Sequence, residues 1–168
     1  MSAPEVALSC RNVWKVFGDH PERLRLTPQT TVEELRASGH IAAVRDVSLD
    51  IRQGEMLVVM GLSGSGKSTL VRCLARLLDI TAGKVMVEGR DIGKFSETEL
   101  IELRRKKMGM VFQSFGLLPH RTALENVAFP LEMRGQDRAS RIERARDMLA
   151  LVGLKGREGY FPRELSGG

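Results

Sequence analysis

One segment of the sequence has the residue types and spacing of a phosphate-binding loop. Residues 61–68 read GLSGSGKS, which fits the pattern G-x-x-x-x-G-K-[ST] at every fixed position. Glycines let successive backbone N–H groups converge on an anion, and a helix that starts here adds a partial positive charge. Lys67 supplies a cation for β- and γ-phosphates, and the Ser68 hydroxyl is an oxygen ligand suited to Mg²⁺. We therefore expect binding of a triphosphate with Mg²⁺ by Gly61, Leu62, Ser63, Gly64, Ser65, Gly66, Lys67, Ser68 and Thr69.

The residues on either side of this loop predict the elements that hold it. Residues 56–60 read MLVVM, an apolar run typical of a central strand covered on both faces. After the loop, apolar residues from Leu70 to Leu78 recur on one face of a helix, which predicts a helix over residues 67–78. A strand before the loop and a helix that begins at Lys67 are the context that the pattern requires.

The remainder of the first part of the chain predicts further strands. Residues 6–17, 44–51, 84–88 and 108–112 have the apolar, β-branched or alternating composition of strands. Residues 18–43 interrupt this pattern and predict a loop with one short helix, because Thr30 and Glu33 have the spacing of a capping box and Gly39 follows. A second capping box, Ser96 with Glu99, predicts a helix that ends in the basic residues 104–107.

From residue 113 onward the pattern is helical. Thr122 and Glu125 predict a capped helix that contains Pro130, which should kink it. A further helix over about residues 138–152 should end at Gly153. Strands followed by a loop, a helix, a strand and then helices predict an α/β nucleotide-binding fold with a helical insertion.

Composition limits the classes of protein and of site. The chain has 168 residues, 42% of them hydrophobic, which suits about one domain with a packed core. A net charge of +5 fits a phosphate-bearing ligand, an anionic membrane surface or nucleic acid, and selects none of them. Cys10 and Cys73 predict two reduced thiols of a cytosolic protein. We expect no secretory signal, because residues 1–10 hold no basic cluster followed by an apolar stretch. The sequence also has no zinc-ligand spacing and no apolar run of the ~20 residues that a membrane helix needs.

Three more blocks of sequence, together with the loop, resemble the ATP-binding subunits of ABC transporters. Residues 44–49 (VRDVSL) are similar to the strand before the loop, 111–120 (VFQSFGLLPH) to the Q-loop, and 161–168 (FPRELSGG) to the start of the signature motif. The resemblance covers nearly the whole chain. It implies an α/β P-loop NTPase fold of the ABC type, with an antiparallel β subdomain and a P-loop core at residues 1–113, an insert at 18–43, and a helical subdomain at 114–168.

The resemblance also implies roles for residues outside the loop. Phe17 would stack on adenine, with Trp14 as a nearby rival whose simpler interpretation is core packing. Gln113 would contact Mg²⁺ or the attacking water. Lys67 and Gln113 are thus the catalytic candidates, and Ser68 and Gln113 the metal-binding candidates.

Partners follow from the same resemblance. Two subunits would hold two ATP molecules between them head to tail, each closing its signature residues on the ATP of the other. Transmembrane permease subunits and, indirectly, a solute-binding protein complete such a system, which places the subunit on the cytoplasmic face of the membrane. The insert at 18–43, the segment 39–48 and the run at 118–129 resemble subunits for glycine betaine and proline uptake, so osmoprotectants are the expected solutes. The signature residues are Ser166, Gly167 and Gly168.

The family pattern continues past Gly168 with a strand that ends in Asp-Glu and with a later His. Those residues help to hold Mg²⁺, polarise water and sense the γ-phosphate. We therefore expect the chain to be a C-terminally truncated ABC nucleotide-binding domain that hydrolyses ATP negligibly by itself. We also expect it to be poorly soluble alone, because residues 56–60 would have an open edge.

Other functions use the same loop. An ABC-type ATPase could serve another solute, or act on nucleic acid or ribosomes. The candidate contacts for nucleic acid are the basic residues 104–107 and the cations Arg134, Arg138, Arg141, Arg144 and Arg146. Aromatic residues, which stack on bases, are only 5% of the chain, and this disfavours nucleic acid. A small-molecule kinase would leave the signature segment without a role. A module that binds nucleotide without hydrolysis is the remaining alternative.

Overall fold

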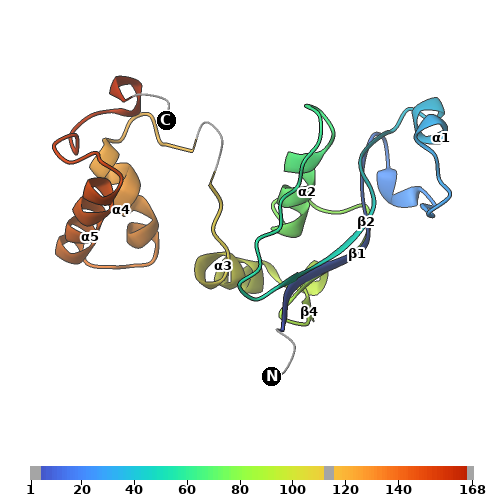
Figure 1. Cartoon of the computed structure of the whole chain (residues 1–168), viewed down its shortest axis with the longest axis horizontal. Coiled ribbons are helices and arrows are strands. Elements are labelled where there is room, and N and C mark those ends of the chain that lie inside the picture. The colour runs from blue at the N-terminus through green and yellow to red at the C-terminus, as the bar shows by residue number, and fades with distance from the viewer. Residues whose placement is uncertain (1–4, 112–115, 166–168) are drawn as a thin grey trace. The chain divides into compact units, whose positions relative to one another are not determined.

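A computed structural model describes residues 5–111 and 116–165 of the chain. The chain divides into two compact units, Met1–Met108 and Gly109–Gly168. The strands belong to the first unit, and the second unit is helical (Figure 1). Within the described ranges, no helix combines the length and the apolar character needed to cross a bilayer.

The first unit is built on a four-stranded antiparallel sheet with the strand order β2-β1-β3-β4. β1 and β2 lie side by side (Figure 1), and both carry a bulge. At the bulges Asn12 and Asp46 adopt left-handed φ values of 47° and 48°, and the Asn12 amide donates to the Asp46 carboxylate at 2.9 Å. The strands are β1 (Val6–Phe17), β2 (Ile41–Arg52), β3 (Ala82–Val87) and β4 (Arg90–Asp91), which confirms the strands predicted at 6–17, 44–51 and 84–88.

Two helices of the first unit pack with this sheet. α2 (Lys67–Leu74) buries Leu70 and Leu74 against a cluster that includes Val13 of β1 and Val44 of β2. α2 ends four residues before the predicted end at 78, because Arg76 takes a left-handed φ of 51° that a helix cannot contain. α3 (Glu97–Lys106) begins with the predicted capping box and buries Leu100. Cys10 and Cys73 are buried free thiols, as expected.

The insert between β1 and β2 forms a second, smaller core. It contains a 3₁₀ turn at Pro21–Arg23 and the short helix α1 (Val32–Ala37), and Leu35 of α1 packs with Trp14 and Val16 of β1. Its capping box is Thr31 with Glu34, one residue later than predicted. The Thr30 hydroxyl instead accepts from the Thr27 N–H at 3.0 Å, so it completes the preceding turn and does not cap the helix. Trp14 is confirmed as a core residue with 2% of its surface exposed.

Two predicted strands are not formed. Residues 56–60 and 108–111 have no strand assignment, and no backbone hydrogen bond joins them to another segment of the described chain. Their apolar side chains are exposed, including Met56 at 88%, Met60 at 85% and Val111 at 99%. A strand is stabilised by the ladder with its neighbour, and apolar composition alone does not supply that neighbour. Phe112, the last residue of the second predicted strand, lies outside the described residues.

The described part of the second unit contains two α-helices and a 3₁₀ turn at Pro162–Glu164. α4 (Ala123–Met133) begins with the predicted capping box of Thr122 and Glu125 and contains Pro130. α5 (Arg138–Leu151) is capped by Asp137 and is followed by Gly153, as predicted. The two helices pack together, and small side chains fill the space between them because Ala128 of α4 and Ala145 of α5 are buried.

Candidate nucleotide-binding site

The predicted phosphate-binding loop leads directly into α2. Gly66 is the N-cap residue with a left-handed φ of 89°, and Lys67 is the first residue of the helix. In the described part of the chain, no acceptor meets the backbone N–H groups of Gly64, Gly66 and residues 67–69. A helix N-terminus always leaves its first amides without intrahelical partners, and here the loop adds two more. These amides and the positive end of α2 form a site for an anion.

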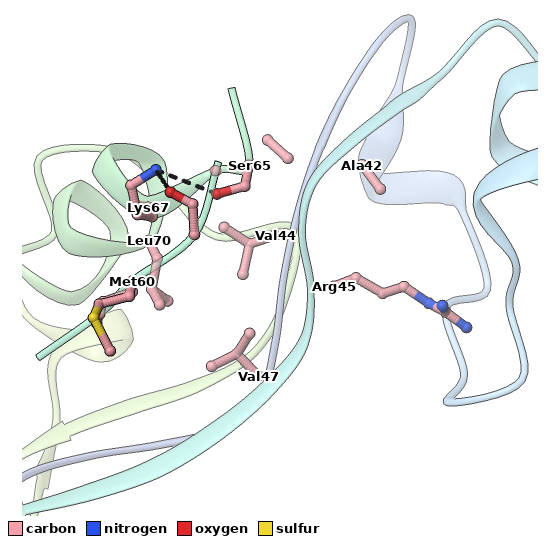
Figure 2. A pocket seen from close by; sticks show the side chains of 12 residues that line it. Ala42, Val44, Arg45, Val47, Met60, Ser65, Lys67 and Leu70 are labelled. Atoms are coloured by element: carbon pink, nitrogen blue, oxygen red, sulfur yellow. Dashed lines mark hydrogen bonds between the residues drawn. The ribbon is translucent and has the colours of Figure 1, made fainter. Parts of the chain in front are cut away.

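The Lys67 side chain folds back on the phosphate-binding loop, where we expect it to contact the phosphates. Its ammonium donates to the Gly61 carbonyl oxygen at 2.9 Å and to the Ser65 hydroxyl at 3.4 Å (Figure 2). It also donates to the Leu62 carbonyl oxygen at 2.6 Å. All three acceptors are uncharged. A phosphate oxygen is a stronger acceptor for an ammonium than a carbonyl, so an incoming polyphosphate can take over these donors without a large movement of the side chain.

Two cavities adjoin the loop. One, of 190 Å³, is lined by residues 64–69 together with Ala43 of β2. The other, of 410 Å³, lies between β2 and α2 and is mainly apolar, with Val44 and Val47 facing Leu70 (Figure 2). The Arg45 side chain points to the opposite side of β2 (Figure 2). The smaller cavity is lined by every residue that carries an unpaired amide, whereas only Gly66 and Lys67 of these line the larger one, so the smaller cavity is the candidate position for phosphate.

Phe17, the aromatic residue expected to stack on adenine, ends β1 and is 43% exposed. Val13 of β1 packs in the same cluster as Leu70 of α2, whereas Val16 packs with the insert. Because side chains alternate along a strand, Phe17 lies on the α2 side of β1. The Lys15 ammonium is 5.0 Å from the centre of the Phe17 ring, a cation–π contact.

The described residues fit a Mg²⁺ ion that is held partly by the protein and partly by the phosphates of a bound nucleotide. Ser68 places an exposed hydroxyl in the first turn of α2, where no described group hydrogen-bonds to it. Among the residues described, no group of three His, Cys, Asp or Glu side chains could hold a metal ion. Mg²⁺ commonly takes one or two protein oxygens and completes its shell with phosphates and water, and one hydroxyl at the phosphate site fits that pattern.

The structure brings together only some of the predicted site residues. Residues 61–69 and Phe17 belong to the first unit, as do the two cavities. Gln113, Ser166, Gly167 and Gly168 lie outside the described residues. Sequence reasoning missed Ala43, which lines both cavities through a part of β2 that carries no motif. Ala43 contributes through its backbone, so its residue type does not reveal its place in the site.

Cys73, on α2, is the nearest titratable thiol to the loop. Burial raises its pKa, and the nearby Lys15 ammonium opposes that shift. The thiol is therefore neutral at physiological pH and acts as a small apolar side chain in the core. It has no part in phosphate chemistry.

Comparison with known proteins identifies the family. The family described as ABC transporter matches residues 44–168. The chain belongs to the ABC transporter family. That match includes the phosphate-binding loop and all residues of both units after residue 43, so the resemblance inferred from the sequence is confirmed.

Two curated relatives cover nearly all of this ABC transporter chain. The trimethylamine N-oxide transport system ATP-binding protein TmoW of Ruegeria pomeroyi is 66% identical over 96% of the chain and 48% of its own length. The glycine betaine/proline betaine transport system ATP-binding protein ProV of Escherichia coli is 48% identical over 97% of the chain and 42% of its own length. The chain thus spans about half the length of the curated relatives it matches.

A solved structure shows the same fold. The ATP-binding cassette MJ0796, in a dimeric post-hydrolysis state bound to ADP and Pi, superposes with a TM-score of 0.76 at 32% identity. The match covers 95% of this chain and 63% of that one. The ABC-type P-loop fold predicted from sequence is therefore confirmed, with its antiparallel sheet and its helices.

Proposed function

We propose that this chain binds ATP with Mg²⁺ and provides the nucleotide-binding part of an ABC importer for small methylated amines. The observation that carries the proposal is the row of unpaired amides at Gly64, Gly66 and residues 67–69, with the Lys67 ammonium beside them. Amides that meet no acceptor, a helix N-terminus and a cation together match a polyphosphate and no uncharged ligand.

Each residue has a defined task in this proposal. The amides of residues 64–69 bind the β- and γ-phosphate oxygens, and Lys67 transfers its donors from the Gly61 and Leu62 carbonyls to the same oxygens. The Ser68 hydroxyl holds Mg²⁺, which when bound would neutralise charge on the phosphates. Phe17 stacks on adenine through the exposed part of its ring. Gln113 would orient the attacking water.

Assembly belongs to the same proposal. We expect two copies to bind two ATP molecules head to tail, with residues 166–168 of each copy reaching the γ-phosphate of the other. ATP binding would close this dimer and hydrolysis would open it. The dimer would contact permease subunits at the cytoplasmic face of the membrane, and a solute-binding protein would deliver the solute to those permease subunits. The dimeric form of MJ0796 supports the formation of a dimer by analogy.

The relatives narrow the solute class. TmoW belongs to a trimethylamine N-oxide transport system and ProV to a glycine betaine/proline betaine system. Trimethylamine N-oxide and glycine betaine both present three methyl groups on a positively polarised nitrogen. The higher identity to TmoW favours trimethylamine N-oxide over the glycine betaine and proline expected from the sequence blocks.

A transport assay tests this function in the complete system. The full subunit, its permease and its solute-binding protein are reconstituted in liposomes, and ATP hydrolysis is measured with trimethylamine N-oxide, glycine betaine or methionine. We expect stimulation by a methylated amine and none by methionine. Stimulation by methionine alone would contradict the solute class, and hydrolysis that no solute affects would contradict the importer.

The structure weakens one argument for the nucleic-acid alternative, the basic residues 104–107. The basic residues at the end of α3 are engaged in ion pairs: Lys106 with Glu102 at 2.8 Å, and Lys107 with Glu88 at 2.9 Å. Arg105 also pairs with Glu102, at 2.9 Å. A surface that binds phosphate backbone needs cations available for phosphate, and these are partly neutralised by neighbouring carboxylates.

A further inference from the structure

His40 stands out among the described residues as the single polar or charged residue that is buried. Only 9% of its surface is exposed. It lies between α1 and β2, immediately before Ile41, the first residue of β2. The predicted nucleotide site does not use it, and the sequence resemblance assigns it no role.

The imidazole ring is hydrogen-bonded on both sides. Nε2 is 2.9 Å from the backbone carbonyl oxygen of Asp19, and Nδ1 is 3.0 Å from the Ser38 hydroxyl. A carbonyl can only accept, so Nε2 carries the hydrogen and donates it to Asp19. The Ser38 hydroxyl also lies 2.9 Å from the Leu35 carbonyl oxygen. The ring therefore ties the end of α1 to the segment that follows β1.

The same ring packs on the backbone of Gly18. A Cβ added at Gly18 would lie 2.5 Å from His40 Cδ2, so the ring occupies the space of the missing side chain. His40 thus contacts both residues that follow Phe17: Gly18 by van der Waals packing and Asp19 by a hydrogen bond. Phe17 itself pairs in the sheet with Ile41, the residue after His40.

We propose that His40 is a positioning residue for the nucleotide base. It fixes the end of β1 so that the Phe17 ring is in place before adenine arrives. The inference rests on the proposed function, in which Phe17 stacks on adenine. Because Phe17 is 43% exposed, the core covers it only in part, and the position of its ring also depends on the backbone that His40 contacts. A ring that is fixed in advance loses less conformational entropy when a ligand binds.

This arrangement gives the two ends of the nucleotide separate supports. Residues 61–69 hold the phosphates, whereas the insert acts through His40 on the base alone. Loss of the contacts of His40 with Gly18 and Asp19 should therefore weaken the binding of ligands that carry adenine. The binding of ligands that consist of phosphate only should not change. A general structural role of His40 would weaken both classes equally.

Calorimetric titration with two probes separates these possibilities. Mg-ATP and Mg-tripolyphosphate are titrated into the wild-type chain and into the variants His40→Ala, His40→Gln, Ser38→Ala and Phe17→Ala. His20→Ala is the matched control, since His20 is an exposed histidine of the same insert. Tripolyphosphate binding also reports whether each variant is folded.

We expect His40→Ala and Phe17→Ala to weaken Mg-ATP by about tenfold and to leave tripolyphosphate unchanged, because one hydrogen bond or one ring stack is lost. His40→Gln keeps a donor near the position of Nε2 and should recover most of the affinity. Ser38→Ala, which leaves the ring in place, should cost about threefold for ATP only. His20→Ala should match the wild type for both probes.

Other results would overturn the inference. Equal weakening of ATP and tripolyphosphate in His40→Ala and Ser38→Ala would assign His40 a structural role alone. Unchanged ATP affinity in these variants would remove any role in base binding, and unchanged affinity in Phe17→Ala would remove the ring as the platform. A wild-type chain that binds neither probe would contradict the proposed function itself, which is a distinct failure.

Discussion

Gly66 packs against Ala43 so closely that a side chain at position 66 has no room. A Cβ built on Gly66 would overlap the carbonyl oxygen of Ala43 and its carbonyl carbon, and the backbone of Gly66 is left-handed with φ of 89°. The start of α2 is therefore pressed onto β2 at the point where the phosphate-binding amides begin. This contact explains how a sheet strand without any motif positions the loop.

Gly66→Ala should destabilise the chain and displace the loop. The substitution adds both a strained left-handed backbone, worth about 1–2 kcal/mol, and the overlap with Ala43. Gly64→Ala is the matched control, because Gly64 is also left-handed at φ of 77° but a Cβ there meets nothing within 4 Å. Urea denaturation should show a larger loss of unfolding free energy for Gly66→Ala. Equal losses would mean that the packing on Ala43 is unimportant.

Lys67→Ala should lower affinity for Mg-ATP by about 10- to 100-fold, since hydrogen bonds to charged groups are the strong ones. The three bonds of the ammonium to Gly61, Leu62 and Ser65 are lost at the same time, so the loop should also become more mobile. Lys94→Ala, which removes an exposed lysine of the same unit, serves as the control in the titration. Wild-type affinity in Lys67→Ala would exclude the ammonium from phosphate binding.

Asn126 organises the segment that precedes α4. Its amide nitrogen lies 3.0 Å from each of the carbonyl oxygens of Leu118, Arg121 and Thr122, and its Oδ1 accepts from the Leu118 N–H at 2.6 Å. Asn126→Ala should lower the unfolding free energy by about 1–3 kcal/mol, because these partly buried backbone groups lose their partner. Gln136→Ala, at an exposed amide, should change it little. Similar unfolding curves for both variants would contradict this role.

Helix content should fall in mild acid because three capping boxes depend on ionised glutamates. The backbone N–H of the N-cap residue lowers the pKa of Glu34, Glu99 and Glu125 below the ordinary value of 4.5. A carboxyl whose pKa is lower in the folded state adds stability above its unfolded pKa, and this stability disappears as the pH falls through the folded value.

The measurement is far-UV circular dichroism between about pH 6 and pH 2. Glutamine can fill the same capping position but does not titrate. The triple variant Glu34→Gln, Glu99→Gln and Glu125→Gln should therefore lose helix signal less steeply below about pH 4.5 than the wild type. Identical acid curves would show that the boxes do not contribute through their charge.

Local signals predicted much of the structure. The spacing of Ser96 and Glu99, and of Thr122 and Glu125, located two helix starts to the residue, because a capping box is a contact within a few residues of chain. The loop at 61–68 was also predicted from local residues, because its glycines allow the backbone conformation that leads into α2. At Thr30 and Thr31, two hydroxyls competed for the cap, and the preceding turn decided which one took it.

Features that depend on distant segments could not be predicted in this way. Residues 56–60 have the composition of a central strand, yet they are exposed, because a strand needs a partner that composition does not specify. The contact of Gly66 with Ala43 and the clamp of His40 on Gly18 and Asp19 join residues more than 20 positions apart. Gly66 belongs to the phosphate-binding motif, but no motif identifies Ala43 or His40 as a contact residue.

The most direct test is calorimetric titration of Mg-ATP into the wild-type chain. The unpaired amides of Gly64 and residues 66–69 and the Lys67 ammonium predict saturable heat with one site per chain, which Lys67→Ala should strongly reduce and Lys94→Ala should leave unchanged. A folded wild-type chain that gives no heat above dilution with Mg-ATP, at several temperatures, would contradict the account.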